Sequence, residues 1–304
     1  MVTLLRHHGI GCLRWATNHF PLRSSLCLES HGAERHGWVN LGEAPTDLNE
    51  IRSVWYRHPA PFALAPNLTA DEKRFASGEV RAAFYGLLRT LDCFWINHPD
   101  RVQIAESKML QLKVAQMIGF EIPRSLVTND PAAVRAFFDA CDRRIVYKAF
   151  RSGFFAETDR AVYTTPLTEE HLERIQQIRN TPGIFQAHVE KRADLRVTVI
   201  GRKVFAVEIH SQGLAQARDD WRSVDVEQLP HHPHQLPERV EQQCHRLLQY
   251  FGLVYGAIDL ILTPDGRYVF LENNPSGQFG WVEGRTGLQL TESLAELLVA
   301  GRVL

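Results

Sequence analysis

The segment at residues 255–278 constrains the fold of this chain more than any other. Two apolar runs, residues 257–262 and 267–271, flank the sequence Pro-Asp-Gly. Asp-Gly between β-forming residues predicts a tight β-hairpin. With a two-residue turn Asp259 lies directly opposite Glu272, whereas a four-residue loop makes them diagonal neighbours on the same face. Either register brings two carboxylates together.

The polar side chains of this hairpin suit a divalent cation. Successive side chains of a strand alternate between its faces, so Asn274 projects on the same side as Glu272. Two carboxylates about 5 Å apart repel each other unless a positive charge lies between them. One or two carboxylates and an amide oxygen, completed by substrate phosphates, are typical ligands of Mg²⁺. We therefore predict Asp259, Glu272 and Asn274 as metal ligands; for the hairpin alone, a capped Asp259 and a solvated Glu272 stay an open alternative.

These residues resemble the ATP-grasp superfamily, in which an Asp on one strand and a Glu-x-Asn on the next hold Mg²⁺. The similarity is greatest to the microviridin and graspetide maturases, ATP-grasp ligases that cyclise ribosomally made peptides. Their metal strand continues into Asn-Pro-x-Gly-Gln-aromatic, which this chain has at residues 274–279. A Trp-Tyr-Arg-x-Pro segment like one of theirs occupies residues 55–59.

The resemblance implies an α/β (α+β) ATP-grasp fold in three parts. These are an N-terminal pre-ATP-grasp α/β domain (1–101), a central lid-like domain (102–190) and a C-terminal antiparallel-sheet domain (191–304), with the nucleotide between the last two. Within the first part, residues 2–5 and 53–57 are typical of strands. A long amphipathic helix is expected after the cap residue Thr69, with acidic residues in its first turn.

Composition limits the partners and the compartment. With 34 basic and 35 acidic residues the net charge is −1, which indicates no global attraction to nucleic acid or membrane. No run approaches the length of a membrane span, and residues 1–15 lack the apolar core of a signal peptide. The five cysteines are scattered and never in Cys-x-x-Cys spacing, as in reduced cytosolic proteins. We expect a cytoplasmic protein, and a surface linker at the histidines and proline of residues 231–234.

Two lysines stand out in the middle of the chain. Lys108 lies in a predicted helix that ends at Gly119, and Lys148 lies in an apolar strand, where it must meet an anion or reach water. An exposed helix lysine and an exposed edge-hairpin lysine are the respective alternatives. The resemblance implies that the nucleotide is held by residues of this region and of the hinge that follows: Lys108, Lys148, Ser152, Gly153, Gln186, Val189 and Glu190.

Two arginines of the last part are candidates for stabilising an acyl phosphate, because a planar guanidinium fork suits that group. Arg196 lies in a hairpin predicted about Gly201-Arg202, and Arg222 follows a polar loop. The alternative for each is a salt bridge to Asp194 or Asp219. Glu208 is considered as a further acid of the site.

The resemblance implies an ATP- and Mg²⁺-dependent ligase that is a homodimer. It would phosphorylate Asp or Glu side chains of a precursor peptide, and a Ser or Thr hydroxyl or a Lys amine would then attack to give a lactone or a lactam. A leader segment of the precursor is expected to bind near residues 204–210. A ligase that adds a free amino acid is disfavoured by the Pro-Ser-Gly-Gln-Phe tail, and a non-catalytic ATP-binding regulator by the complete metal set. No residue is marked as a general base.

Overall fold

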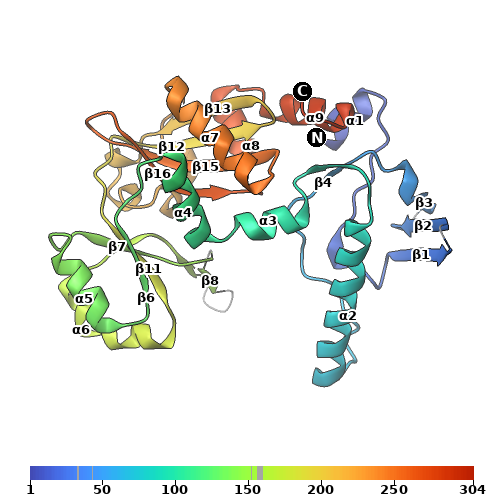
Figure 1. Ribbon diagram of the computed structural model, residues 1–304, viewed down its shortest axis with the longest axis horizontal. Helices are drawn as coiled ribbons and strands as arrows, with labels where there is room; N and C mark the ends of the chain where they lie inside the picture. Colours follow the sequence, from blue (N-terminus) through green and yellow to red (C-terminus); the bar gives the residue numbers. More distant parts are fainter. Residues whose placement is uncertain (33, 43, 152, 156–159) are drawn as a thin grey trace.

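The structure is a computed structural model that describes residues 1–32, 34–42, 44–151, 153–155 and 160–304 (Figure 1). Its two largest sheets are a four-stranded sheet in the middle of the chain and a five-stranded sheet near the C-terminal end. All strand pairs within these two sheets are antiparallel. This mixed architecture of helices and antiparallel sheets agrees with the expected α/β (α+β) class.

The N-terminal region contains a small antiparallel sheet, a parallel strand pair and one long helix. Its elements are α1 (Val2–His7), η1 (Thr17–His19), β1 (Ser25–His31), β2 (Glu34–Asn40), β3 (Thr46–Asp47), η2 (Leu48–Glu50), β4 (Ser53–Trp55), α2 (Ala70–Arg89) and β5 (Phe94–Ile96). The long helix begins as predicted, because Thr69 and Glu72 form a reciprocal capping box. The strand predicted at residues 2–5 is wrong: this segment is α1, whose buried Leu5 packs with α9 at the chain's other end.

The central region is organised around a sheet with two helices packed on one face. Its elements are α3 (Pro99–Ala105), α4 (Lys108–Ile118), β6 (Ser125–Thr128), α5 (Pro131–Asp139), β7 (Ile145–Lys148), β8 (Gly153–Phe155), β9 (Arg160–Val162), β10 (Thr165–Pro166), α6 (Glu169–Glu173), η3 (Ile175–Asn180) and β11 (Gly183–Ala187). The sheet order is β10-β7-β11-β6, and β8 pairs with β9 as a separate hairpin. Ile145 and Phe185 point toward α5 and α6 in the core, so the alternation of strand side chains turns Lys148 and Gln186 to the opposite face. This face is called the uncovered face because it is the one turned away from α5 and α6.

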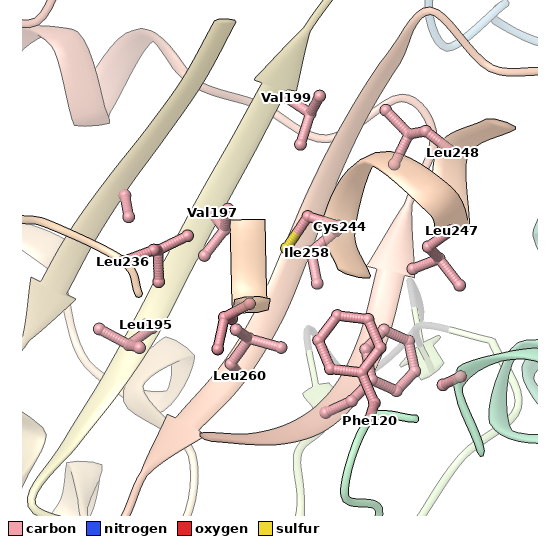
Figure 2. Close-up of a cluster of buried hydrophobic side chains, with 14 of the residues drawn as sticks. Phe120, Leu195, Val197, Val199, Leu236, Cys244, Leu247, Leu248, Ile258 and Leu260 are labelled. Atoms are coloured by element: carbon pink, nitrogen blue, oxygen red, sulfur yellow. The ribbon is translucent and has the colours of Figure 1, made fainter. Parts of the chain in front are cut away.

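The C-terminal region is organised around the sheet β14-β13-β12-β15-β16. Its elements are β12 (Ala193–Ile200), β13 (Lys203–Ile209), η4 (Ser211–Gly213), η5 (Ala215–Ala217), η6 (Trp221–Ser223), η7 (Val226–Gln228), β14 (His231–His234), α7 (Glu238–Phe251), β15 (Tyr255–Leu262), β16 (Tyr268–Asn274), α8 (Gly280–Thr286) and α9 (Leu290–Ala300). One sheet face forms the main core with α7, where Val197, Leu247 and Ile258 are fully buried (Figure 2). Helix α4 also packs on this core, so its side chains belong in space to the C-terminal sheet although the chain continues from it into the central sheet.

The hairpin β15–β16 has neither of the two predicted loops. The backbone N–H of Thr263 bonds to the carbonyl of Arg267 at 3.0 Å, which leaves a three-residue loop, and Gly266 takes a positive φ of 83°. Such a loop alone would place Asp259 opposite residue 271. A bulge between Asp259 and Leu260 shifts the register by one residue and restores the pair Asp259–Glu272. The predicted opposition of the two carboxylates is therefore confirmed, by a different route.

Residues 231–234 are not the surface linker predicted for them. They form β14, the edge strand that pairs with β13 over Ala206–Ile209. An edge strand tolerates Pro233 because a proline lacks only an N–H group. In the part of the chain that the structure describes, no helix has the length and apolar character needed to span a bilayer.

Candidate active site

Three charged side chains form a row across the C-terminal sheet. In the strand register Arg196 of β12 lies opposite Asp259 of β15, which lies opposite Glu272 of β16. Because directly paired residues share a face, all three point away from α7. Arg196 Nη1 donates to Asp259 Oδ1 at 2.8 Å, and both side chains are almost fully buried. The row thus holds two carboxylates and one guanidinium in fixed positions on rigid strands.

Two further cations converge on Glu272 from outside the sheet. Lys108 Nζ, at the start of α4, lies 2.8 Å from Glu272 Oε2. Arg222 Nη1 lies 3.4 Å from Glu272 Oε1. Lys108 Nζ also donates to the carbonyl of Ala149 at 3.1 Å, directly after β7. Lys108 therefore joins Glu272 to the strand that carries Lys148.

Burial and the neighbouring charges shift the pKa values of Glu272 and Asp259 in opposite directions. Burial alone would raise the pKa of Glu272, but the charges of Lys108 and Arg222 lower it to about 2. Burial raises the pKa of Asp259 above its ordinary value; Arg196 opposes this shift and the neighbouring Glu272 adds to it. Burial lowers the pKa of Lys148 to about 8, although Glu272 opposes the shift. Burial therefore disfavours the charged forms of Asp259 and Lys148. A cation bound near Asp259 and a phosphate bound near Lys148 would stabilise these charged forms.

The strand β16, which carries Glu272 and Asn274, is anchored by two side-chain amides that the sequence did not mark. The side chain of Gln111, in α4, forms the two backbone hydrogen bonds that a further strand would form with the edge strand β16. Its Oε1 accepts from the N–H of Asn273, and its Nε2 donates to the carbonyl of the same residue, both at 2.8 Å. Asn97 donates to the carbonyls of Tyr255 and Pro275 at 2.8 Å each. A glutamine within an otherwise apolar helix face was the signal available for the first of these. Both residues fix the backbone on either side of the predicted ligands.

Asn274 is exposed at the end of β16, and its Oδ1 accepts from the N–H of Ser276 at 3.0 Å. An amide oxygen has a second lone pair, so this contact leaves Asn274 able to accept or coordinate once more. The loop that begins there is tightly packed, since a side chain at Gly277 would meet Ala257 and Arg196. The Pro-Ser-Gly-Gln tail therefore lies against the row of charged residues.

The uncovered face of the central sheet carries two of the predicted nucleotide contacts. Lys148 is half-buried there, and its charge interacts with Glu272, Lys108 and Arg222. Gln186 is 2% exposed; its Nε2 donates to Ser125 Oγ at 2.9 Å, while its Oε1 is buried without a partner among the described residues. A buried carbonyl oxygen without a donor favours a polar ligand beside it.

The remaining predicted residues are placed differently. Val189 and Glu190 lie in the segment that joins β11 to β12, and Glu190 Oε1 forms an exposed ion pair with Arg144 Nη2 at 3.0 Å. Gly153 begins β8, where it pairs with Val162. Ser152 lies outside the described residues.

Two expectations about charges are wrong. Glu208 does not belong to this site: it pairs in register with Leu195, a residue of the α7-covered core, and it contacts His234 Nδ1 at 2.7 Å. The alternatives that paired the arginines with Asp194 or Asp219 are also incorrect, since Arg196 pairs with Asp259 and Arg222 with Asp220. Asp194 is paired instead with Lys191 at 2.8 Å.

The charge balance of the site fits a magnesium nucleotide. Four cationic side chains surround three carboxylates; the cations are Lys108, Lys148, Arg196 and Arg222, and the carboxylates are Asp220, Asp259 and Glu272. Within the described ranges no group of three or more His, Cys, Asp or Glu side chains could hold a metal ion by itself. Two carboxylates and an amide are an incomplete shell for Mg²⁺, which is usually completed by phosphate oxygens and water. The excess of cations supplies partners for those phosphates.

Comparison with known proteins identifies the family. A family model described as "MvdD pre-ATP grasp domain" matches residues 1–103, and no curated protein matches the chain. The crystal structure of the macrocyclase MdnC bound with precursor peptide MdnA, from Microcystis aeruginosa MRC, is 33% identical, and the match covers 98% of this chain and 94% of that chain with a TM-score of 0.87. This chain belongs to the RiPP-associated ATP-grasp ligases, which act on ribosomally made peptides.

Other members of the family have solved structures with nucleotide. A Chryseobacterium gregarium RiPP-associated ATP-grasp ligase in complex with ADP and a leader and core peptide is 30% identical, covering 98% of this chain and 91% of that chain with a TM-score of 0.91. The ATP-grasp ligase PsnB, complexed with a phosphomimetic variant of its minimal precursor, Mg and ADP, is 26% identical, covering 98% and 92% with a TM-score of 0.77. The ATP-grasp fold and the family resemblance predicted from the hairpin are confirmed for this ligase.

Lys148 gives this ligase a predicted pH dependence. Its pKa of about 8 means that the protonated form, which attracts phosphate, is lost as the pH rises through 8. We expect kcat/KM for ATP, which reports the free enzyme, to fall about tenfold per pH unit above that value. Lys148→Arg stays charged and should remove this alkaline limb, whereas Lys113→Arg, on the exposed side of α4, should keep it. If kcat/KM for ATP still falls above pH 8 in Lys148→Arg, the fall does not come from deprotonation of Lys148, and the prediction is wrong.

Proposed function

We propose that this ligase cyclises a ribosomally made precursor peptide, using ATP and Mg²⁺ to activate Asp or Glu side chains of the peptide as acyl phosphates. The observation that carries the proposal is the opposed pair Asp259 and Glu272 on one sheet, with four cationic side chains around it, in a chain that is 33% identical over nearly its whole length to the macrocyclase MdnC. A carboxylate has no leaving group of its own, so condensation with a hydroxyl or amine in water requires this activation.

The roles of the residues follow from their positions. Asp259, Glu272 and Asn274 would hold Mg²⁺, which when bound neutralises and orients the phosphate oxygens. Lys148 and Lys108 face the uncovered side of the central sheet and would bind the phosphates. Their charges also keep Glu272 ionised at neutral pH, so that it is ready to coordinate.

Arg196 and Arg222 would stabilise the charge that develops on the transferred phosphoryl group, because guanidinium groups fixed in advance do not have to reorganise during the reaction. On the other side of the nucleotide, the adenosine end would lie along the segment after β11. Gln186, Val189 and Glu190 would contact this end of the nucleotide. Ser152 and Gly153 would belong to a flap over the phosphates.

We also propose the finer features that accompany this function. The chain would be a cytoplasmic homodimer, without nucleic-acid or membrane partners, with functional domains at residues 1–101, 102–190 and 191–304. Binding of the precursor's leader segment near residues 204–210 stays a prediction. Val207 and Ile209 are fully buried there and Glu208 is half-buried. A test of leader binding therefore requires substitutions at partly exposed positions such as Val204.

The experiment that tests the function is an intact-mass comparison of the precursor peptide encoded beside this gene, after incubation with this ligase and Mg-ATP. Loss of one water per link, with formation of ADP, is the expected result, and fragmentation then distinguishes ester from amide. A mass gain of one amino acid would instead support the ligase type that adds a free amino acid. Nucleotide binding without turnover of any peptide would favour a regulator.

A further inference from the structure

The loop between β13 and β14 carries two adjacent aspartates that contact different parts of the nucleotide site. Asp219 Oδ1 lies 3.2 Å from Nε2 of His188, in the segment after β11. Asp220 Oδ2 accepts at 2.9 Å from the backbone N–H of Thr164, which lies two residues beyond β9 and directly before β10. The loop thus touches both the hinge side of the central sheet and the base of the β8–β9 hairpin.

Asp220 is 5% exposed, and its two oxygens accept four hydrogen bonds. Oδ1 accepts from the N–H of Arg222 at 3.1 Å and from its Nε at 2.9 Å. Oδ2 accepts from Thr164 and from Arg222 Nη2, the latter at 2.8 Å. Burial alone would raise the pKa of Asp220, but the hydrogen bonds and charge of Arg222 lower it to about 2. Only a carboxylate accepts at both ends, so no neutral amide satisfies all four donors.

This arrangement orients the guanidinium of Arg222. The edge formed by Nε and Nη2 faces Asp220, which leaves Nη1 directed at Glu272 Oε1, 3.4 Å away. The intervening Trp221 packs on Trp281 of α8 with ring centroids 5.1 Å apart. The loop is therefore anchored on the C-terminal region while its carboxylate reaches the central region.

We propose that Asp220 is a positioning residue of the ligase: it fixes the free edge of Arg222 at Glu272 and ties that arginine to the base of the β8–β9 hairpin. The part that concerns turnover rests on the proposed function, whereas the link to Thr164 does not. A bidentate bond restricts both torsional freedom and tilt of a guanidinium. Asp220 then joins Arg222 to the hairpin base, so a change of this carboxylate affects both.

The test is Asp220→Asn, which keeps the shape and changes one oxygen to NH₂. In either orientation the NH₂ faces donors, so either the Thr164 contact or the Arg222 fork is lost, and we expect both groups to shift. We expect faster deuterium exchange of the Thr164 amide in the nucleotide-free protein. In turnover, kcat should fall about 10- to 100-fold, with KM for ATP nearly unchanged, because the arginine is misdirected while the lysines still bind the phosphates.

Two variants control this experiment. Asp225→Asn makes the same change in the same loop at an exposed position, where Oδ1 accepts from the N–H of Glu227 at 3.1 Å, and it should change neither readout. Arg222→Lys loses the fork but keeps the carboxylate on Thr164, so it should lower kcat without faster exchange at Thr164.

The proposal is overturned if Asp220→Asn matches Asp225→Asn in both exchange and kcat. Faster exchange with an unchanged kcat would also overturn it, since Asp220 would then be a structural contact alone. If the wild-type ligase cyclises no peptide, the proposed function fails, and the link between Asp220 and Thr164 is decided from amide exchange at Thr164 alone. An unchanged exchange rate in Asp220→Asn would reject that link.

Discussion

Asp259→Asn lowers ATP turnover in the presence of the precursor peptide by about a thousandfold, which corresponds to about 4 kcal/mol of transition-state stabilisation. Asparagine keeps the size of the side chain and one oxygen but removes the charge that a hard cation requires. A metal ion that is weakly held or displaced no longer neutralises the phosphoryl group during transfer. The measurement is the steady-state rate of ADP formation as a function of Mg²⁺ concentration, and the half-maximal concentration should also rise.

The control lies on the same hairpin. Asp265→Asn makes the same chemical change at the exposed loop, where the carboxylate pairs with Arg267, and its turnover should stay within about twofold because such surface changes are small. Asp259→Asn removes the counter-charge of Arg196, but its amide oxygen still accepts from Arg196 and the repulsion with Glu272 is relieved, so its loss of stability should be smaller than that of Arg196→Met. If the turnover of Asp259→Asn stays within about tenfold of the wild-type value, Asp259 is not a metal ligand.

Alternation along strands made the central feature of this site predictable from sequence. The opposition of Asp259 and Glu272 survived an incorrect loop, because both predicted registers kept the two residues on one face. The bulge itself could not be predicted. It lies between two contacts from distant segments: the carbonyl of Glu121 accepts from the N–H of Phe270 at 2.8 Å, and Gln111 pairs with Asn273. Both contacts depend on how α4 and the residues after it pack on the sheet.

The same alternation could have excluded Glu208. A two-residue turn at Gly201-Arg202 pairs Ile200 with Lys203, and the structure has this register. Counting back from it places Glu208 opposite Leu195, on the apolar face.

By contrast, the role of Asp220 depends on contacts between regions far apart in sequence, with Thr164 at one end and Glu272 at the other. Periodicity within one strand carries no information on such contacts, so the sequence marked Arg222 but not the residue that orients it.

Arg196→Met destabilises the nucleotide-free protein by about 3–5 kcal/mol, because removal of one partner leaves a buried carboxylate without its counter-charge. Arg196 and Asp259 are 8% and 13% exposed as side chains, and Glu272 lies directly opposite Asp259. Adding Asp259→Asn to Arg196→Met should recover part of the loss, because the uncompensated charge is gone. The measurement is the free energy of unfolding in urea for wild type, both single variants and the double variant.

Arg192→Met is the matched comparison, since Arg192 also pairs with a carboxylate, that of Glu208, but is 52% exposed. Arg192→Met should lower the free energy of unfolding by less than about 1 kcal/mol, as for other exposed ion pairs. Equal losses of stability for Arg192→Met and Arg196→Met, or a double variant no more stable than Arg196→Met, would contradict the argument from the buried ion pair.

The stability that the double variant is expected to recover has a consequence for function. If the charge of Asp259 is tolerated only beside a cation, a bound metal ion can replace part of the stabilisation that Arg196 provides, so Mg-ADP should raise the stability of Arg196→Met more than that of the wild type.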